Sequence, residues 1–407
     1  MRFIHISDLH LGKTLHGVNL LESGDQPHWV EAFLALAAEQ KPDAVVIAGD
    51  VYDRGAPAAG AVELLSLLLT GLTELGVQVM LTPGNHDSPQ RLAFGRKLLA
   101  KQGVHIAPPL TAPGRLSRVT LSDEHGPVDF WLMPYVFPAL VGEALGGEMP
   151  RSYEEAVRVL LAAQGPDFAR RNVLVAHQNV TFGGVEAERG GSESMVGGVG
   201  QVEYTAFDGF DYVALGHIHA GYAVGRPAVR YAGSPLCYHF RETRQAPKGP
   251  LLVELGPKGT EPVLRLLPLE PLHPLRALEG DYESLRAAEA ARTGGGEYVS
   301  VTLTDRRVSP AVSDDLHALF EAKGSLLLEL SSSWQAEGGA GAPTAAALRE
   351  RGLAELFAEF CVQRTGNAPD EAEQALLARA AELALTAELR LPPEERQIDA
   401  LRRQAGM

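Results

Sequence analysis

The sequence predicts an α/β fold built around a largely parallel sheet. Short apolar runs rich in β-branched residues recur at residues 3–7, 44–48, 77–82, 173–176 and 212–215. Helix-length segments with apolar residues three or four positions apart separate the first three runs, at residues 28–40 and 58–75. Strands that alternate with helices predict βαβ units, and uninterrupted apolar strands predict burial on both faces of a sheet.

The C-terminal third predicts smaller units. Residues 251–255 and 263–269 predict a hairpin around a turn at 256–259, and three prolines within residues 268–274 mark a linker. Helical and strand patterns then alternate, at residues 282–292, 298–304, 313–322 and 325–331. A Gly/Ala-rich stretch at 337–343 precedes two helical patterns, at 345–360 and 369–385. We therefore expect a main domain over 1–270, a small α+β capping domain over 271–336 and a helical tail over 337–407.

Composition narrows the class of protein. The 407 residues carry a net charge of −15, are 45% hydrophobic and include only two cysteines, which is typical of a soluble globular protein without disulfides. The first residues lack the features of a signal peptide, and no long uncharged apolar run is present, so we expect a cytoplasmic protein without membrane contact. The acidic balance disfavours DNA binding through a continuous basic surface, but not a nuclease whose positive charge comes from metal ions.

Metal-binding residue types stand at the end of every apolar run. The motifs, in chain order, are Asp8-x-His10, Gly49-Asp50, Gly84-Asn85-His86-Asp87, His177 and Gly216-His217-x-His219. In an open α/β sheet the carboxyl ends of the strands lie along one edge, where ligands bind. Five strand ends would therefore bring their polar groups to one place.

The residue types suit a pair of divalent ions. Two carboxylates, one amide and four imidazoles can give each ion four ligands if Asp50 bridges both, and mixed nitrogen and oxygen ligands favour Mn, Fe or Zn over Ca, with open octahedral positions favouring Mn. Two such ions can activate water and stabilise an in-line displacement at phosphorus. The residues alone therefore predict hydrolysis of a phosphomonoester or a phosphodiester.

Each motif has a simpler interpretation when taken singly. An Asp or a Gly-Asn pair after a strand is often a helix cap or a turn, and a lone His177 is more often a core histidine. The conjunction of five such placements in chain order favours the metal site.

The ordered motifs resemble those of the calcineurin-like metallophosphoesterases, whose fold is a β-sandwich of mixed sheets flanked by helices. Longer stretches resemble the nuclease subunits of bacterial SbcCD complexes: residues 4–12, 84–88, 211–219 and 230–235. The order of main domain, capping domain and helical tail also agrees with that family. Residues 104–171 match nothing diagnostic.

The resemblance implies a role for each site residue. One metal would be held by Asp8, His10, Asp50 and His219, and the other by Asp50, Asn85, His177 and His217. His86 would face the scissile phosphate as a general acid or a charge-stabilising group. Asp53 and Asp87 are helper candidates, Asp87 either orienting the His86 imidazole or stabilising its turn.

The same resemblance implies Mn-dependent cleavage of DNA, as an exonuclease on double-strand ends and an endonuclease on single strands and hairpins. It also implies a homodimer and a coiled-coil ATPase partner, SbcC, bound through the tail helices. The leucines of residues 64–72 exceed what one core-facing stripe needs, which fits a dimer contact or burial within the monomer. A small-molecule phosphoesterase and a scaffold without catalysis are the alternative functions.

Overall fold

We analysed a computed structural model of the chain, which describes residues 1–184, 200–244, 247–334, 369–370, 373–376 and 379. The chain separates into two compact units, 1–334 and 335–407. The predicted tail helix at 345–360 lies outside the described residues. Of the tail helix at 369–385, the structure describes a helical turn at 373–376.

Two six-stranded sheets form the main domain. The first has the order β16 (Val263–Leu266), β15 (Leu251–Glu254), β1 (Arg2–Ile6), β4 (Ala44–Ala48), β5 (Gln78–Thr82) and β6 (Val104–Ile106). The second has the order β13 (Ala223–Val224), β14 (Arg226–Tyr231), β12 (Tyr212–Gly216), β9 (Arg171–His177), β8 (Gly126–Met133) and β7 (Ser117–Asp123). In the first sheet β1, β4, β5 and β6 run parallel, and β15 pairs antiparallel with both β1 and β16. In the second sheet β14, β12, β9 and β8 run parallel, and the edge strands β13 and β7 pair antiparallel with their neighbours. The five apolar runs thus divide between two sheets instead of forming one, and the mixed sandwich implied by the resemblance is confirmed.

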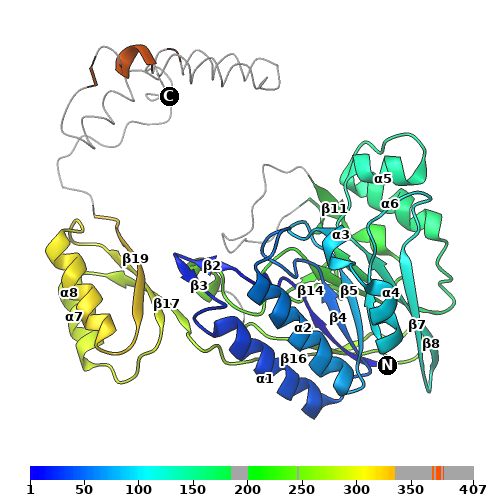
Figure 1. The fold of residues 1–407 in the computed structure, drawn as a ribbon, viewed down its shortest axis with the longest axis horizontal. Helices are drawn as coiled ribbons and strands as arrows, with labels where there is room; N and C mark the ends of the chain where they lie inside the picture. The colour runs from blue at the N-terminus through cyan, green and yellow to red at the C-terminus, as the bar shows by residue number, and fades with distance from the viewer. Residues whose placement is uncertain (185–199, 245–246, 335–368, 371–372, 377–378, 380–407) are drawn as a thin grey trace. The chain divides into compact units, whose positions relative to one another are not determined.

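The apolar core lies in three layers. Between the sheets, the Phe3 ring contacts the rings of Phe130 and Tyr212 edge-on, each with a centroid distance of 5.6 Å. Helices α1 (Asp25–Gln40) and α2 (Ala59–Glu74) pack on the outer face of the first sheet (Figure 1). Helices α5 (Pro138–Leu145) and α6 (Tyr153–Gln164) pack on the outer face of the second. Burial of both faces explains the uninterrupted apolar strands.

The small domain is a three-stranded parallel sheet covered by two helices. Its strands are β17 (Leu275–Gly280), β18 (Tyr298–Leu303) and β19 (Leu326–Ser332), and its helices are α7 (Tyr282–Ala291) and α8 (Pro310–Glu321). Asp281 and Ser309 cap the two helices by accepting hydrogen bonds from the backbone N–H groups of Ser284 and Val312.

Short elements complete the described chain: β2 (Thr14–Leu15), β3 (Val18–Asn19), α3 (Pro89–Leu92), α4 (Arg96–Leu99), η1 (Ala100–Gln102), β10 (Asn179–Thr181), β11 (Gln201–Glu203), η2 (Tyr204–Phe207) and η3 (Phe240–Arg244). Within the described residues, no helix has both the length and the apolar character needed to cross a membrane.

Candidate metal centre

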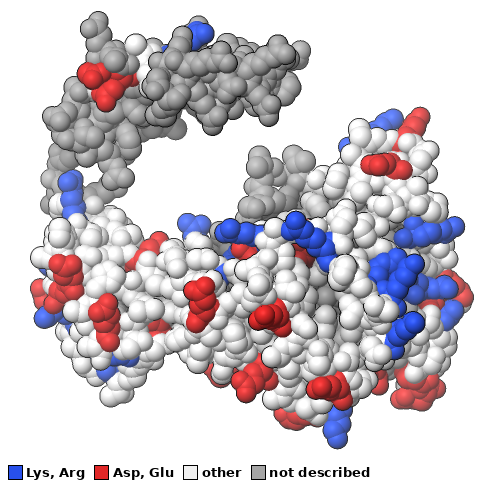
Figure 2. Space-filling model, in the orientation of Figure 1, with Lys and Arg blue, Asp and Glu red and all other residues white. Residues whose placement is uncertain are grey.

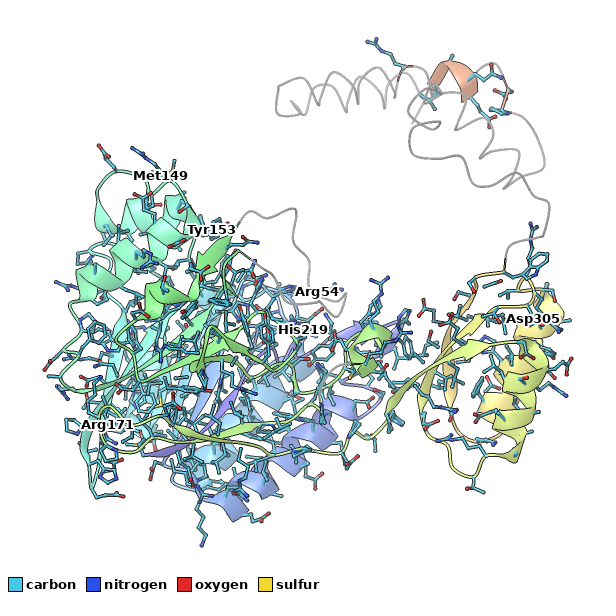
Figure 3. All side chains as sticks on the ribbon, turned by 180° about the vertical axis from the view of Figure 1, so that it is seen from behind. Arg54, Met149, Tyr153, Arg171, His219 and Asp305 are labelled. Carbon is cyan, nitrogen blue, oxygen red and sulfur yellow. The ribbon has the colours of Figure 1, made fainter. Side chains whose placement is uncertain are left out.

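The strand-end motifs of both sheets converge on one site. Asp8 and His10 follow β1, Asp50 follows β4, and Asn85 and His86 follow β5 of the first sheet, while His177 ends β9 and His217 and His219 follow β12 of the second. Figure 3 labels His219 and Arg54 on this side of the main domain and Arg171 at its other end. The sandwich therefore builds the site from two sheet edges.

The local backbone of the site is unusual. The φ angles of Asp8, His10, Asp50 and His217 are 54°, 42°, 48° and 107°, in the left-handed region that non-glycine residues rarely adopt. Such conformations persist where the surrounding structure enforces them, and they are concentrated at functional sites. Here they turn the side chains inward at the strand ends.

The first group of potential ligands is Asp8, His10 and His219. One ligand atom of each lies within 4.8 Å of the others, and all three residues are buried. The Nε2 atoms of His10 and His219 are 3.2 Å apart. Two neutral imidazoles that face each other with their lone pairs repel unless a proton or a cation lies between them, so this geometry fits a metal ion.

The second group centres on the amide oxygen of Asn85. His177 Nε2 and His217 Nδ1 each lie 3.0 Å from Asn85 Oδ1. The Asp50 carboxylate lies between the groups, with Oδ2 3.4 Å from His177 Nε2 and 3.6 Å from His10 Nε2. The structure thus brings together all seven expected ligands, with Asp50 where a bridging carboxylate would stand.

His86 lies beside these groups with a defined orientation. Its Nδ1 is 3.0 Å from the backbone carbonyl oxygen of Asp53, and its Nε2 is 4.0 Å from Asp50 Oδ2. A neutral or protonated ring can donate from Nδ1 to that carbonyl, which turns Nε2 toward the site. The His86 side chain is 30% exposed, whereas those of His10 and His177 are buried.

The two helper candidates have different positions. The Asp53 carboxylate lies 3.5 Å from His10 Nδ1 and 2.9 Å from Lys13 Nζ. Asp87 instead accepts hydrogen bonds from the backbone N–H groups of Val51, Tyr52 and Gly84, so its carboxylate ties two strand-end loops together. Of the two roles considered for Asp87, the contacts favour the stabilisation of the turn.

Burial and charge shift the pKa values of the site in opposite directions. Burial raises the pKa of Asp8 and lowers that of His10 to about 4. Burial acts to lower the pKa of His177, but the Asp50 and Asp8 carboxylates outweigh it and raise that pKa to about 9. Buried carboxylates thus hold a positive charge among the imidazoles, and a divalent cation would take the place of that charge.

Sequence reasoning missed several groups around the site. The Tyr135 ring lies 6.3 Å from the His177 ring and 6.4 Å from the His217 ring, measured between centroids. Tyr135 closely follows the end of β8, so recognition of that strand would have revealed it by the same strand-end pattern. The Tyr238 ring lies 5.5 Å from both His10 and His219, but its local sequence carries no such signal.

Comparison with known proteins identifies the family. Residues 1–221 match the calcineurin-like phosphoesterase family, and residues 271–365 match a family described as the type 5 capsule protein repressor C-terminal domain, SbcD_C. The D subunit of the SbcCD nuclease of Staphylococcus saprophyticus is 34% identical over 288 residues, which cover 70% of this chain and 73% of the relative. The chain belongs to the SbcD family of nuclease subunits, within the calcineurin-like phosphoesterases. It is a hydrolase of the metallophosphoesterase class, as expected from the motifs.

A second relative agrees with this assignment. The D subunit of the SbcCD nuclease of Staphylococcus epidermidis is 30% identical over 311 residues, covering 75% of this chain and 79% of the relative. Among solved structures, that of TT1561 from Thermus thermophilus aligns with 57% of this chain and 89% of its own, at a TM-score of 0.35 and 12% identity.

Proposed function

We propose that this SbcD-family protein hydrolyses DNA phosphodiester bonds with two divalent ions, most favourably Mn²⁺, as an exonuclease on double-strand ends and an endonuclease on single strands and hairpins. The observation that carries the proposal is the convergence of seven nitrogen and oxygen ligands around Asp50, with His86 beside them. Asp8, His10, Asp50 and His219 hold one ion, and Asp50, Asn85, His177 and His217 the other. No thiolate belongs to this ligand set, which fits Mn²⁺.

The chemistry divides between the ions and the protein. When bound, a pair of divalent ions lowers the pKa of a water molecule and stabilises charge on phosphate oxygens. As a water oxygen bonds to phosphorus, the bond from phosphorus to the leaving oxygen breaks, and that oxygen needs a proton. In its doubly protonated form His86 can supply this proton from Nε2 while its Nδ1–H donates to the Asp53 carbonyl and fixes the orientation of the ring.

The surface charge supports dependence on metal. On the face shown in Figure 2, Lys and Arg side chains are interspersed with Asp and Glu. The net charge of −15 also disfavours attraction of DNA by the protein's charge alone. In our proposal, the positive charge at the site of cleavage therefore comes from bound metal ions.

The decisive experiment measures nucleotide release from an end-labelled DNA duplex with Mn²⁺, Mg²⁺ or EDTA. We expect Mn-dependent release, and a loss of about 10²- to 10⁴-fold in His86→Gln with unchanged metal content, the range for removal of a general acid. Unchanged activity in a folded, metal-loaded His86→Gln protein would exclude this role. A parallel assay with para-nitrophenyl phosphate tests the small-molecule phosphoesterase, which turnover of that ester with intact DNA would favour.

We also propose a homodimer, through the surface around helix α4 instead of the leucine-rich face of α2. Five of the six α2 leucines are buried, which confirms the simpler expectation for them, and only Leu67 is exposed, at 54%. Nearby, Phe94 and Leu98 are 86% and 71% exposed, and Phe94 lines an apolar groove with Val62 and Leu69. Phe94→Glu should convert a dimer to a monomer in size-exclusion chromatography with light scattering, whereas an unchanged mass would exclude this surface.

The partner in our proposal is an SbcC-like coiled-coil ATPase, bound by the tail at 337–407. The support is the family membership and the amphipathic pattern of the tail. Truncation after Gly341 should abolish co-purification of the ATPase while activity on short single strands persists. Retained co-purification would place the binding site elsewhere.

A further inference from the structure

A buried carboxylate stands directly behind one of the proposed metal ligands. Glu242 lies in the short helix η3, and its side chain has no exposed surface. Its Oε1 is 3.4 Å from His219 Nδ1, and its Oε2 is 2.9 Å from Lys248 Nζ and accepts a hydrogen bond from the backbone N–H of Tyr238. A buried carboxylate is costly unless it is paired, and here both oxygens have partners.

The orientation of the His219 ring decides which of its nitrogens faces Glu242 and which is left for a metal. Its Nε2 points to the His10 ring in the first ligand group, so Nδ1 is the atom that faces Glu242. A hydrogen on Nδ1 that is donated to Glu242 leaves the lone pair on Nε2, the form that binds a metal. A carboxylate acceptor also makes the imidazole a stronger ligand than a carbonyl acceptor does.

The other imidazoles provide a contrast. His177 Nδ1 lies 2.9 Å from the carbonyl oxygen of Ala48, an uncharged acceptor. Among the described residues, His10 is the other ligand with a carboxylate at its second nitrogen, that of Asp53 at 3.5 Å. Two imidazoles of the first ligand group, those of His10 and His219, are thus backed by carboxylates.

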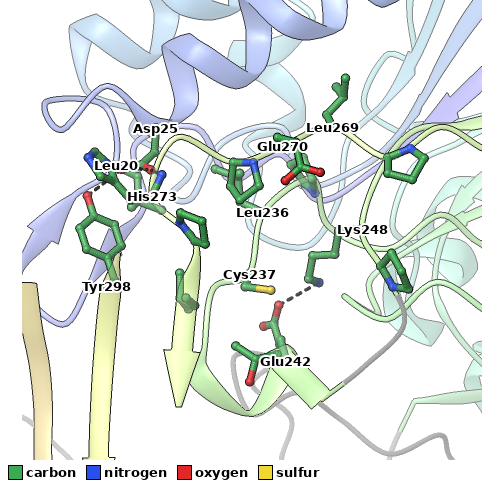
Figure 4. Close-up of a pocket in the computed structure, with 17 residues that line it drawn as sticks. Leu20, Asp25, Leu236, Cys237, Glu242, Lys248, Leu269, Glu270, His273 and Tyr298 are labelled. Carbon is green, nitrogen blue, oxygen red and sulfur yellow. Dashed lines mark hydrogen bonds and ion pairs between the residues drawn. The ribbon is translucent and has the colours of Figure 1, made fainter. Parts of the chain in front are cut away.

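Lys248 completes the arrangement from the backbone side. Its Nζ donates hydrogen bonds to the carbonyl oxygen of His219 at 2.8 Å and to Ser234 Oγ at 2.7 Å, in addition to its ion pair with Glu242. Figure 4 shows this pair on the wall of a pocket of about 290 Å³. One ion pair therefore holds both the ring and the main chain of His219.

We infer that Glu242, supported by Lys248, is a positioning residue that sets the tautomer and direction of the His219 imidazole for the first metal. This inference rests on the proposed two-metal function. It assigns a role in metal affinity to a residue that does not itself touch the metal or the substrate. Loss of an outer-shell partner of this kind typically lowers metal affinity about 10- to 100-fold.

The test is a Mn²⁺ binding isotherm of the full chain, by calorimetry and electron paramagnetic resonance, for the wild type and Glu242→Gln. We expect one of two sites to weaken about 10- to 100-fold while the other changes less than about threefold, with nuclease activity recovering at high Mn²⁺. Glu289→Gln is the matched control, because Glu289 is a buried carboxylate paired with Arg276 and Lys323 in the small domain. It should lower thermal stability without changing either Mn²⁺ site.

The outcomes separate the inference from the function on which it rests. Unchanged Mn²⁺ binding in Glu242→Gln, beside a wild type that binds two ions, would overturn the inference alone. A wild type that bound no Mn²⁺ would overturn the metal centre and the inference with it. If Glu242→Gln does not fold, Glu242→Asp keeps the charge near Lys248 but shortens the reach to His219, and unchanged binding in that variant would overturn the inference.

Discussion

Replacement of Gly84 by alanine tests how closely the two strand-end loops must approach. Gly84 follows β5, and a Cβ added there would lie 2.1 Å from Asp50 Oδ1 and 2.3 Å from the Asp50 backbone nitrogen. Real Cβ contacts essentially never fall below 3.0 Å. No left-handed φ is required at Gly84, so the obstacle is steric. The absence of a side chain therefore lets Asp50 stand where it does.

The size of the effect follows from these distances. The Asp50 carboxylate or the Gly84 loop must move by at least 0.9 Å, the difference between 2.1 Å and 3.0 Å. Asp50 Oδ2 lies only 3.4 Å from His177 Nε2, and Oδ1 accepts a hydrogen bond of 2.9 Å from the His86 backbone N–H. A misplacement of about 1 Å in an active site can lower the rate about 100-fold, so we expect a loss of about that size in Gly84→Ala.

The assay is the initial rate of nucleotide release from labelled duplex DNA with Mn²⁺, together with thermal unfolding. Gly55→Ala is the matched control, because a Cβ there would lie 3.6 Å from the His86 carbonyl oxygen, an ordinary contact in the same region. That variant should retain activity within about twofold. A Gly84→Ala protein with more than a third of wild-type activity, or an equal loss in Gly55→Ala, would refute the steric reasoning.

Three further predictions concern metal content, turn stability and acid stability. Asp50→Ala should bind fewer than two metal ions per chain by elemental analysis, and two bound ions would contradict the bridging assignment. Asp87→Ala leaves three buried backbone N–H groups without their acceptor and should lower the free energy of unfolding by about 3 kcal/mol in urea with EDTA; a loss below about 1 kcal/mol would contradict this. Burial lowers the pKa of His5 from its ordinary 6.5 to about 3, so stability present above pH 6.5 is lost as the pH falls toward 3. At pH 5 the protein should have lost about 2 kcal/mol of its free energy of unfolding in this way. The difference between the free energies of unfolding in urea at pH 7 and pH 5 should therefore be about 2 kcal/mol smaller in His5→Gln than in the wild type. An equal difference in the variant would exclude His5 as its source.

Local sequence patterns alone were enough to predict helices and strands of this protein and its set of candidate ligands. The predicted helix at 58–75 is observed as Ala59–Glu74, and the strand at 44–48 has the predicted bounds. Apolar periodicity depends on residues that are close in sequence, so it can be recognised without knowledge of the fold. The ligand set could be assembled in the same way, because each metal-binding residue stands at the end of a strand or within a few residues after it.

Tertiary structure decided which strands share a sheet and what lies behind the ligands. Apolar strands buried on both faces look alike in sequence, so nothing local assigns β1 to one sheet and β12 to the other. Glu242 reaches His219 across 23 positions, and Asp87 reaches Val51 across 36. Five of the six α2 leucines also proved to be core once the first sheet lay against them. Such roles depend on contacts between distant segments, which residue type and spacing do not encode. The strand-end ligands could be predicted because each is a metal-binding residue type that lies close in sequence to a strand.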